Sequence, residues 1–119
     1  GMTATSVGAG ANPRIAGGVV STARDYARML RMLAADGMID GTRVLPAELV
    51  REMERDQTAG AAIVGSPHTA YGGAEVRYGI GVGRDRVAAG GQALQVSSQG
   101  AFGFSPWIDR ERGVVGVFA

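Results

Sequence analysis

The stretch Ser97–Asp109, "SSQGAFGFSPWID", decides how this chain folds. Its pattern is typical of a strand, yet two glycines and several small polar residues precede the only tryptophan. A glycine inside a strand costs backbone entropy and packs no side chain. Such a glycine marks either a bulge or bend near a sheet edge, or a place where a ligand or another backbone comes close. The residues alone leave both interpretations open.

Strand patterns also lie on both sides of this stretch. The run "ALQVSS" leads into it, and a turn at Asp109–Gly113 leads on to "VVGVFA". Earlier, "YGIGVG" from Tyr78 alternates glycine with larger residues and predicts a further strand. This G-x-G-x-G run lacks the helix start that a dinucleotide fingerprint requires, so it does not indicate a nucleotide site.

The first half of the chain predicts a helix over 22–36. Ser21 or Thr22 can cap its free N–H groups, and Gly37 provides a left-handed stop. One face of this helix is apolar, with the i, i+3, i+4, i+7 spacing of a buried stripe: Tyr26, Met29, Leu30 and Leu33. We expect these four residues to pack against the sheet, together with Phe102, Phe104, Ile108 or Val115.

A hairpin and a second helix follow. Asp40-Gly41 lies between two short apolar pieces, which is a hairpin turn signal. Pro46 then opens a helix predicted over 46–56, with Leu49, Val50 and Met53 on one face. Residues 57–76 show no periodicity and are expected to form a long loop that holds the only histidine, His68.

Helices followed by adjacent strands with short turns predict an α+β fold. We expect two helices packed on a small antiparallel sheet of about three to four strands. Residues 1–17 are rich in glycine, alanine, serine and threonine, and are predicted to form an extended or flexible arm. Residues 18–119 then make a single α+β domain.

Composition excludes several classes of function. The chain has 119 residues and a net charge of +1, which gives one domain at most and no electrostatic case for nucleic acid or an anionic membrane. No apolar run approaches the roughly 20 residues of a membrane span, and we expect no signal peptide ahead of the folded part. Cysteine is absent, which excludes disulfides and thiol catalysis. No metal or cofactor motif is present, and the compartment is not indicated.

The order of these pieces resembles the C-terminal part of the serine β-lactamase-like family. This group holds class C β-lactamases, D-alanyl-D-alanine carboxypeptidases and related esterases. The resemblance runs from about Pro13 to the end, and its most specific residues are Gly17-Gly18, Ser21-Thr22-Ala23, Asp25 and the run Gly100–Asp109. It implies a partial β-lactamase/transpeptidase-like fold.

The resemblance also implies a substrate-binding strand. Such enzymes carry a Lys-Thr-Gly or His-x-Gly triplet whose glycine lets substrate backbone lie against the strand. The N–H after that glycine is an oxyanion donor. Matched by position, Ser98 takes the Lys/His place, Gln99 the middle, Gly100 the glycine and Ala101 the donor. The neutral Ser98 cannot form the ion pair that a lysine would make with a substrate carboxylate.

The family nucleophile and its base are missing from this chain. The family acylates a serine in Ser-x-x-Lys, and no lysine occurs among the twelve basic residues, which are all arginines. We therefore assign no catalytic residue and expect the isolated chain to be inactive. The alternative, a site built from Ser97, Ser98 or Ser105 with His68 as base and an aspartate as orienter, has no supporting spacing.

Two classes of function remain. One is the C-terminal portion of a serine hydrolase, active only if a partner polypeptide supplies the missing N-terminal part. The other is a non-catalytic, self-associating module derived from that fold. The resemblance implies a sheet that is normally continued by N-terminal strands and covered by a terminal helix. Without these segments, several apolar positions near the end of the chain would lose part of their cover: Val114, Val115, Val117 and Phe118.

We therefore expect a homo-oligomer, formed by sheet pairing, by exchange of the 1–17 arm or by face-to-face packing of sheets. A compact monomer, with the arm folded over the sheet, is the alternative.

Overall fold

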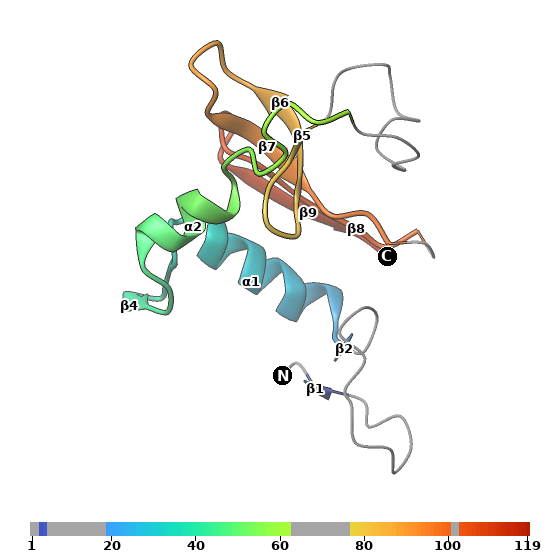
Figure 1. The fold of residues 1–119 in the computed structure, drawn as a ribbon. Coiled ribbons are helices and arrows are strands. Elements are labelled where there is room, and N and C mark those ends of the chain that lie inside the picture. The colour runs from blue at the N-terminus through green and yellow to red at the C-terminus, as the bar shows by residue number, and fades with distance from the viewer. Residues whose placement is uncertain (1–2, 5–18, 63–76, 101–102) are drawn as a thin grey trace, which may run out of the picture.

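The computed structural model describes residues 3–4, 19–62, 77–100 and 103–119 (Figure 1). Its helices are α1 (Ala23–Ala34) and α2 (Ala47–Met53). Two short antiparallel pairs join β1 (Thr3–Ala4) to β2 (Val19–Val20) and β3 (Met38–Ile39) to β4 (Thr42–Arg43). The remaining strands are β5 (Arg77–Tyr78), β6 (Gly83–Val87), β7 (Ala93–Ser97), β8 (Ser105–Asp109) and β9 (Val114–Phe118). Most of the predicted arm, and His68 in the predicted loop, lie outside the described residues.

The main sheet is larger than predicted. Strands β5 to β9 form one five-stranded antiparallel sheet in sequence order, so the expectation of about three to four strands is wrong. Strand β6 has the sequence "GRDRV", and its charged residues hide the strand pattern. The run "YGIGVG" is also not one strand, because the chain reverses between Tyr78 and Gly83, which pair with each other, and Gly81 has φ 72°. One predicted strand is therefore a turn between two strands.

The first helix forms where its pattern predicts. The hydroxyl oxygen of Thr22 accepts a hydrogen bond from the Asp25 N–H at 3.1 Å, which caps the start of α1. At its end Asp36 and Gly37 take positive φ angles of 50° and 89°, and the Gly37 N–H donates to the Met32 carbonyl at 2.8 Å. A Cβ on Gly37 would lie 2.1 Å from the Leu45 carbonyl oxygen, so only glycine fits there.

Helix α1 packs across one face of the sheet, over β8 and β9 (Figure 1). The buried centre consists of Leu30, Ala93, Val96 and Ile108. The rest of the predicted stripe, Tyr26, Met29 and Leu33, packs against this centre with Val115 and Val117. The predicted apolar face of α1 is confirmed, while Phe102 lies outside the described residues.

Helix α2 is shorter than predicted and only part of its expected face is buried. Val50 is 1% exposed, whereas Leu49 is 54% exposed, so these two residues of the predicted apolar face are not buried together. The end of α2 is joined to the sheet because the Met53 carbonyl accepts the Ile80 N–H at 2.8 Å. A Cβ on Gly79 would lie 2.1 Å from that same carbonyl oxygen. The end of α2 is therefore in close backbone contact with the β5–β6 turn.

The other face of the sheet holds the only tryptophan. Trp107 on β8 pairs with Gly116 on β9. A Cβ on Gly116 would lie 2.4 Å from two carbons of the Trp107 indole, so the ring lies against the bare backbone of its neighbour. The glycine on β9 thus makes room for the tryptophan ring.

Candidate functional site

The segment Ser98–Gly100 extends strand β7 beyond its regular end. The Ser98 N–H donates to the Pro106 carbonyl at 3.1 Å, and the Gly100 N–H donates to the Phe104 carbonyl at 2.7 Å. A further bond of 3.1 Å, from the Gly103 N–H to the Gly100 carbonyl, joins the two sides of the connection. The segment that the family resemblance singles out is therefore held in place by the start of β8.

The two glycines in and after this segment, Gly100 and Gly103, differ in whether their conformation requires glycine. Gly103 has φ 88°, a conformation that side chains with a Cβ rarely adopt, so the turn itself requires glycine. Gly100 is not one of the glycines with a positive φ, and a Cβ there would meet the Phe104 carbonyl oxygen only at 3.4 Å, an ordinary contact. Nothing in the described chain requires glycine at position 100. A glycine there leaves room for a ligand or another backbone to come close.

One edge of this segment is open among the described residues. Pairing between β6 and β7 ends at Gly83 and Ser97, so Ser98–Gly100 has no strand partner on the β6 side within the described ranges. Because N–H groups alternate between the two edges of a strand, the Gln99 N–H faces that open edge. Ser98 and Gly100 are exposed and Gln99 is half-buried. Ala101, matched to the oxyanion donor, lies outside the described residues.

The alternative serine site gains no contact from the structure. Ser97 is 6% exposed, and its hydroxyl has no hydrogen-bond partner within the described part of the chain. Its neighbours across the sheet are Gly83 and Trp107, which supply no acid or base. Ser105 pairs with Phe118 on the other side of β8. The proposed base, His68, lies outside the described residues.

Helix α1 is linked to the candidate segment through a pair of aromatic rings. The rings of Tyr26 and Phe104 meet edge to face, with centroids 4.8 Å apart and planes at 83°. Burial raises the pKa of the Tyr26 phenol. Because the Phe104 carbonyl accepts the Gly100 N–H, this aromatic pair links α1 to the backbone of the candidate segment.

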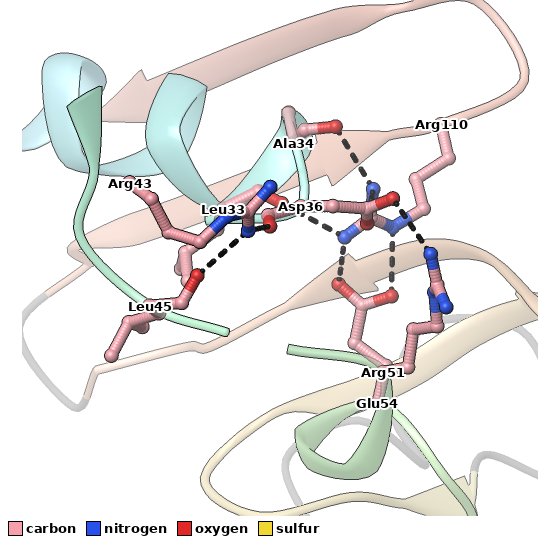
Figure 2. Close-up of polar contacts among 8 residues, drawn as sticks. All are labelled: Leu33, Ala34, Asp36, Arg43, Leu45, Arg51, Glu54 and Arg110. Carbon is pink, nitrogen blue, oxygen red and sulfur yellow. Dashed lines mark hydrogen bonds and ion pairs between the residues drawn. The ribbon is translucent and has the colours of Figure 1, made fainter. Parts of the chain in front are cut away.

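A buried charged cluster, which sequence patterns did not reveal, joins both helices to the sheet (Figure 2). Arg110, directly after β8, donates to both carboxylate oxygens of Glu54 at 2.7 Å. It also donates to the carbonyls of Leu33 and Ala34, each at 3.0 Å, and lies 3.5 Å from Asp36. The side chains of Arg110 and Glu54 are 15% and 9% exposed. The turn "DRERG" carries no apolar signal that would mark its second residue as buried.

The pKa of Arg110 reflects these contacts. Burial lowers the pKa of the guanidinium, but the hydrogen bonds and charge of Glu54, with the charge of Asp36, raise it by more. The guanidinium donates to carbonyls at the C-terminal end of α1, where the helix dipole favours a positive charge. The cluster joins α1, α2 and the β8–β9 turn at one end of β8, whereas Ser98–Gly100 lies along the other end of that strand.

A second carboxylate organises the β8–β9 turn itself. Asp109 is 4% exposed and accepts hydrogen bonds from the Arg112 backbone N–H at 2.9 Å and from its guanidinium at 2.7 Å. These bonds, with the nearby charge of Arg86 at 3.8 Å, hold the pKa of Asp109 below its usual range. Arg86 also pairs with Glu111. The turn predicted at Asp109–Gly113 is confirmed and is closed by its own charges.

Two further kinds of site receive no support from the described residues. They contain no group of histidine, cysteine, aspartate or glutamate that could hold a metal ion. No helix in the same ranges is both long and apolar enough to cross a membrane.

Comparison with known protein sequences gives matches to a short part of the chain. No family model matches the chain. Two proteins of Mycobacterium tuberculosis, one described only as uncharacterized, are each 56% identical over 41 residues. That match covers 34% of this chain and 10% of each relative, so the chain spans a small part of their length.

Solved structures match almost the whole chain. A putative beta-lactamase from Bacteroides dorei has a TM-score of 0.82 and 35% identity, over 91% of this chain and 34% of its own. A putative 6-aminohexanoate-dimer hydrolase from Bacillus anthracis has a TM-score of 0.61 and 26% identity, over 84% of this chain and 23% of its own. The chain thus spans about a third or less of the proteins it matches. The resemblance is confirmed: this chain has the fold of the C-terminal part of the serine β-lactamase-like family.

Proposed function

We propose that this chain is the substrate-binding C-terminal portion of a β-lactamase-related serine hydrolase and is inactive alone. The observation that carries the proposal is the open strand edge at Ser98–Gly100, where position 100 is a glycine that the described chain does not itself require. The 35% identity with a putative beta-lactamase over 91% of the chain supports the reaction class. The absence of lysine supports the lack of activity.

Each residue of the segment has a defined part in this proposal. The backbone edge at Gln99 pairs with the main chain or amide group of the substrate, and Gly100 leaves room for its approach. The Ala101 N–H stabilises the oxyanion that forms when a serine oxygen attacks the acyl carbon. Ser98 contributes a hydroxyl and no charge. The nucleophile and its lysine come from other polypeptide, either a partner chain or a further segment of a longer protein.

An NMR titration with benzylpenicillin tests the binding half of the proposal. We expect amide shifts to concentrate at Ser98–Gly100, and a Gly100→Val variant to lose them because its side chain obstructs the edge. Gly90→Val is the matched control, since a Cβ on Gly90 meets nothing within 4 Å. Shifts that spread over other elements, or that survive in Gly100→Val, would contradict the assigned edge.

Turnover assays test the other half. The isolated chain should hydrolyse neither β-lactams nor short-chain esters, because no Ser-x-x-Lys is present. Hydrolysis that remains through purification and disappears in Ser97→Ala, Ser98→Ala or Ser105→Ala would show a complete site within the chain. That result would replace the proposal with the alternative serine site.

A second candidate function is a non-catalytic module that associates with itself. The observation in its favour is the sheet edge at β9, where Val114 is 44% exposed and Phe118 is 71% exposed. Another strand that pairs with such an edge would bond its free backbone N–H and C=O groups and cover its exposed apolar side chains. Sedimentation at tens of micromolar separates this candidate from a compact monomer, whose single species would have a mass of 12.2 kDa.

A further inference from the structure

The bare side of Gly100 stands beside the side chain of Phe104. A Cβ built on Gly100 would lie 3.5 Å from the Phe104 Cβ, so the two positions are neighbours on one face of the sheet. The Phe104 ring meets the ring of Tyr26 on α1, with centroids 4.8 Å apart, and both residues are half-buried. This is therefore the face that α1 covers, and a group that approaches Gly100 from this face comes to lie beside the aromatic pair.

The surroundings of Gly100 on this face are apolar and carry no charge along the strands. No charged residue occurs in the stretch from Ser97 to Ile108. Pro106, whose carbonyl accepts the Ser98 N–H, is buried, and Val82, directly before β6, packs against the core. Since side chains alternate along a strand, the exposed Ser98 hydroxyl is on the same face as position 100. A few polar groups among apolar side chains is the usual composition of a small-molecule site.

The chemistry of this face favours an uncharged ligand group. A carboxylate placed against the apolar side chains would lose part of its hydration, and the stretch from Ser97 to Ile108 offers it no positive charge in return. An aromatic ring instead gains a contact with the Tyr26–Phe104 pair, in which rings already meet edge to face.

We propose that Tyr26 and Phe104 are specificity-determining residues that select an uncharged aromatic acyl group, such as that of an arylacetyl ester or amide. This inference rests on the proposed function and names its substrate class. The aromatic pair lies along the acyl group, while the backbone at Gln99 and Gly100 contacts the ester or amide group itself. Tyr26 contributes its ring and not its hydroxyl, so phenylalanine should replace it without loss.

Three small amides test the selection in an NMR titration of the chain. Phenylacetamide carries a phenyl ring, acetamide lacks it, and succinamate ends in a carboxylate. We expect phenylacetamide to shift the amide signals of Ser98 and Gly100 and the ring protons of Phe104. Acetamide and succinamate should bind about tenfold more weakly, which is the size of one lost aromatic contact.

Variants of the aromatic pair show which residues make the selection. Tyr26→Leu keeps an apolar side chain on α1 and should weaken phenylacetamide about three- to tenfold, whereas Tyr26→Phe should bind as the unmodified chain does. Phe118→Leu is the matched control, because that ring is 71% exposed and lies on β9 opposite Ser105, away from the site. Urea unfolding checks that each variant is folded, and Phe104→Leu repeats the test from the other ring.

Each outcome decides between the site and its specificity. Equal binding of phenylacetamide and acetamide, or unchanged binding in both leucine variants of the pair, overturns this inference. Tighter binding of succinamate overturns the selection against charge, and a loss in Tyr26→Phe as large as in Tyr26→Leu overturns the role of the ring. An unshifted spectrum with phenylacetamide also overturns this inference. Benzylpenicillin then separates the two proposals, since shifts at Ser98–Gly100 keep the proposed function and their absence removes it as well.

Discussion

Replacing Arg110 with methionine removes the guanidinium that joins α1, α2 and the β8–β9 turn while keeping most of the side chain's apolar stem. Glu54, with a side chain only 9% exposed, then loses both of its 2.7 Å hydrogen bonds. A buried charge left without its partner costs about 3–5 kcal/mol. The carbonyls of Leu33 and Ala34 lose their donors as well, so we expect a loss toward the upper end of that range. Since small domains have only about 5–15 kcal/mol of stability, this change alone should reduce folding severely.

Urea unfolding followed by circular dichroism measures this loss. The matched control is Arg28→Met, which removes a surface ion pair with Asp40 whose partners are each 63% exposed, and it should cost about 1 kcal/mol or less. Adding Glu54→Leu to Arg110→Met should recover stability, because the uncompensated carboxylate is then removed. If Arg110→Met costs no more than Arg28→Met, the Arg110 cluster is not a major contributor to the fold.

Three further predictions concern the core, the tryptophan and acid stability. Leu30→Ala should cost about 2–5 kcal/mol, while Leu49→Ala, at an exposed position, should have little effect on the unfolding curve; equal effects would contradict the assigned faces. Gly116→Ala should displace the Trp107 ring, cost about 1–3 kcal/mol and change the near-ultraviolet spectrum, and an unchanged spectrum would contradict that contact. Asp109, whose pKa is lowered in the fold, stabilises the protein above its unfolded pKa of about 3.9. That contribution is lost as the pH falls below about 4, so stability should fall less steeply in acid for Asp109→Asn than for the unmodified chain, and an equally steep fall would contradict it.

Local signals in the sequence were sufficient where one residue type dictates a conformation. The Asp40-Gly41 turn is confirmed, and both residues have positive φ angles, 48° and 77°, as a tight hairpin turn requires. The apolar stripe of α1 is confirmed because its period matches the helix and the whole stripe meets one sheet. Gly37 follows the end of α1, and this position requires glycine because a Cβ there would meet the Leu45 carbonyl.

Sequence patterns gave wrong predictions, or none, where a charged residue is buried or an apolar residue is exposed. Strand β6 carries two arginines and an aspartate, yet Arg84 is 5% exposed and its guanidinium lies 3.8 Å from the carboxylate of Asp56, far away in the chain. Leu49 has the spacing of a core residue, but α2 is short and only the side holding Val50 reaches other elements. Arg110 lies in a turn that has the composition of solvent-exposed sequence. In each case the decisive neighbour is far away in the chain.

The candidate site depended on the family resemblance more than on its own residues. Ser98, Gln99 and Gly100 have no distinctive side-chain chemistry, and their importance lies in a backbone edge that only the fold defines. The assignment of Ala101 as oxyanion donor stays a prediction, as do the domain boundaries at residues 17 and 18. The contact of Tyr26 with Phe104 agrees with the expected packing of the α1 stripe, and only the edge-to-face geometry of the two rings had no signal in the sequence.

The most direct test of the central claim is the intact mass of the chain after incubation with a fluorophosphonate, a probe that phosphonylates activated serines with loss of fluoride. The account predicts a single species at the unmodified mass of about 12.2 kDa, because the chain has no lysine to activate a serine in the family's way. A stoichiometric covalent adduct on any serine of this chain would contradict it.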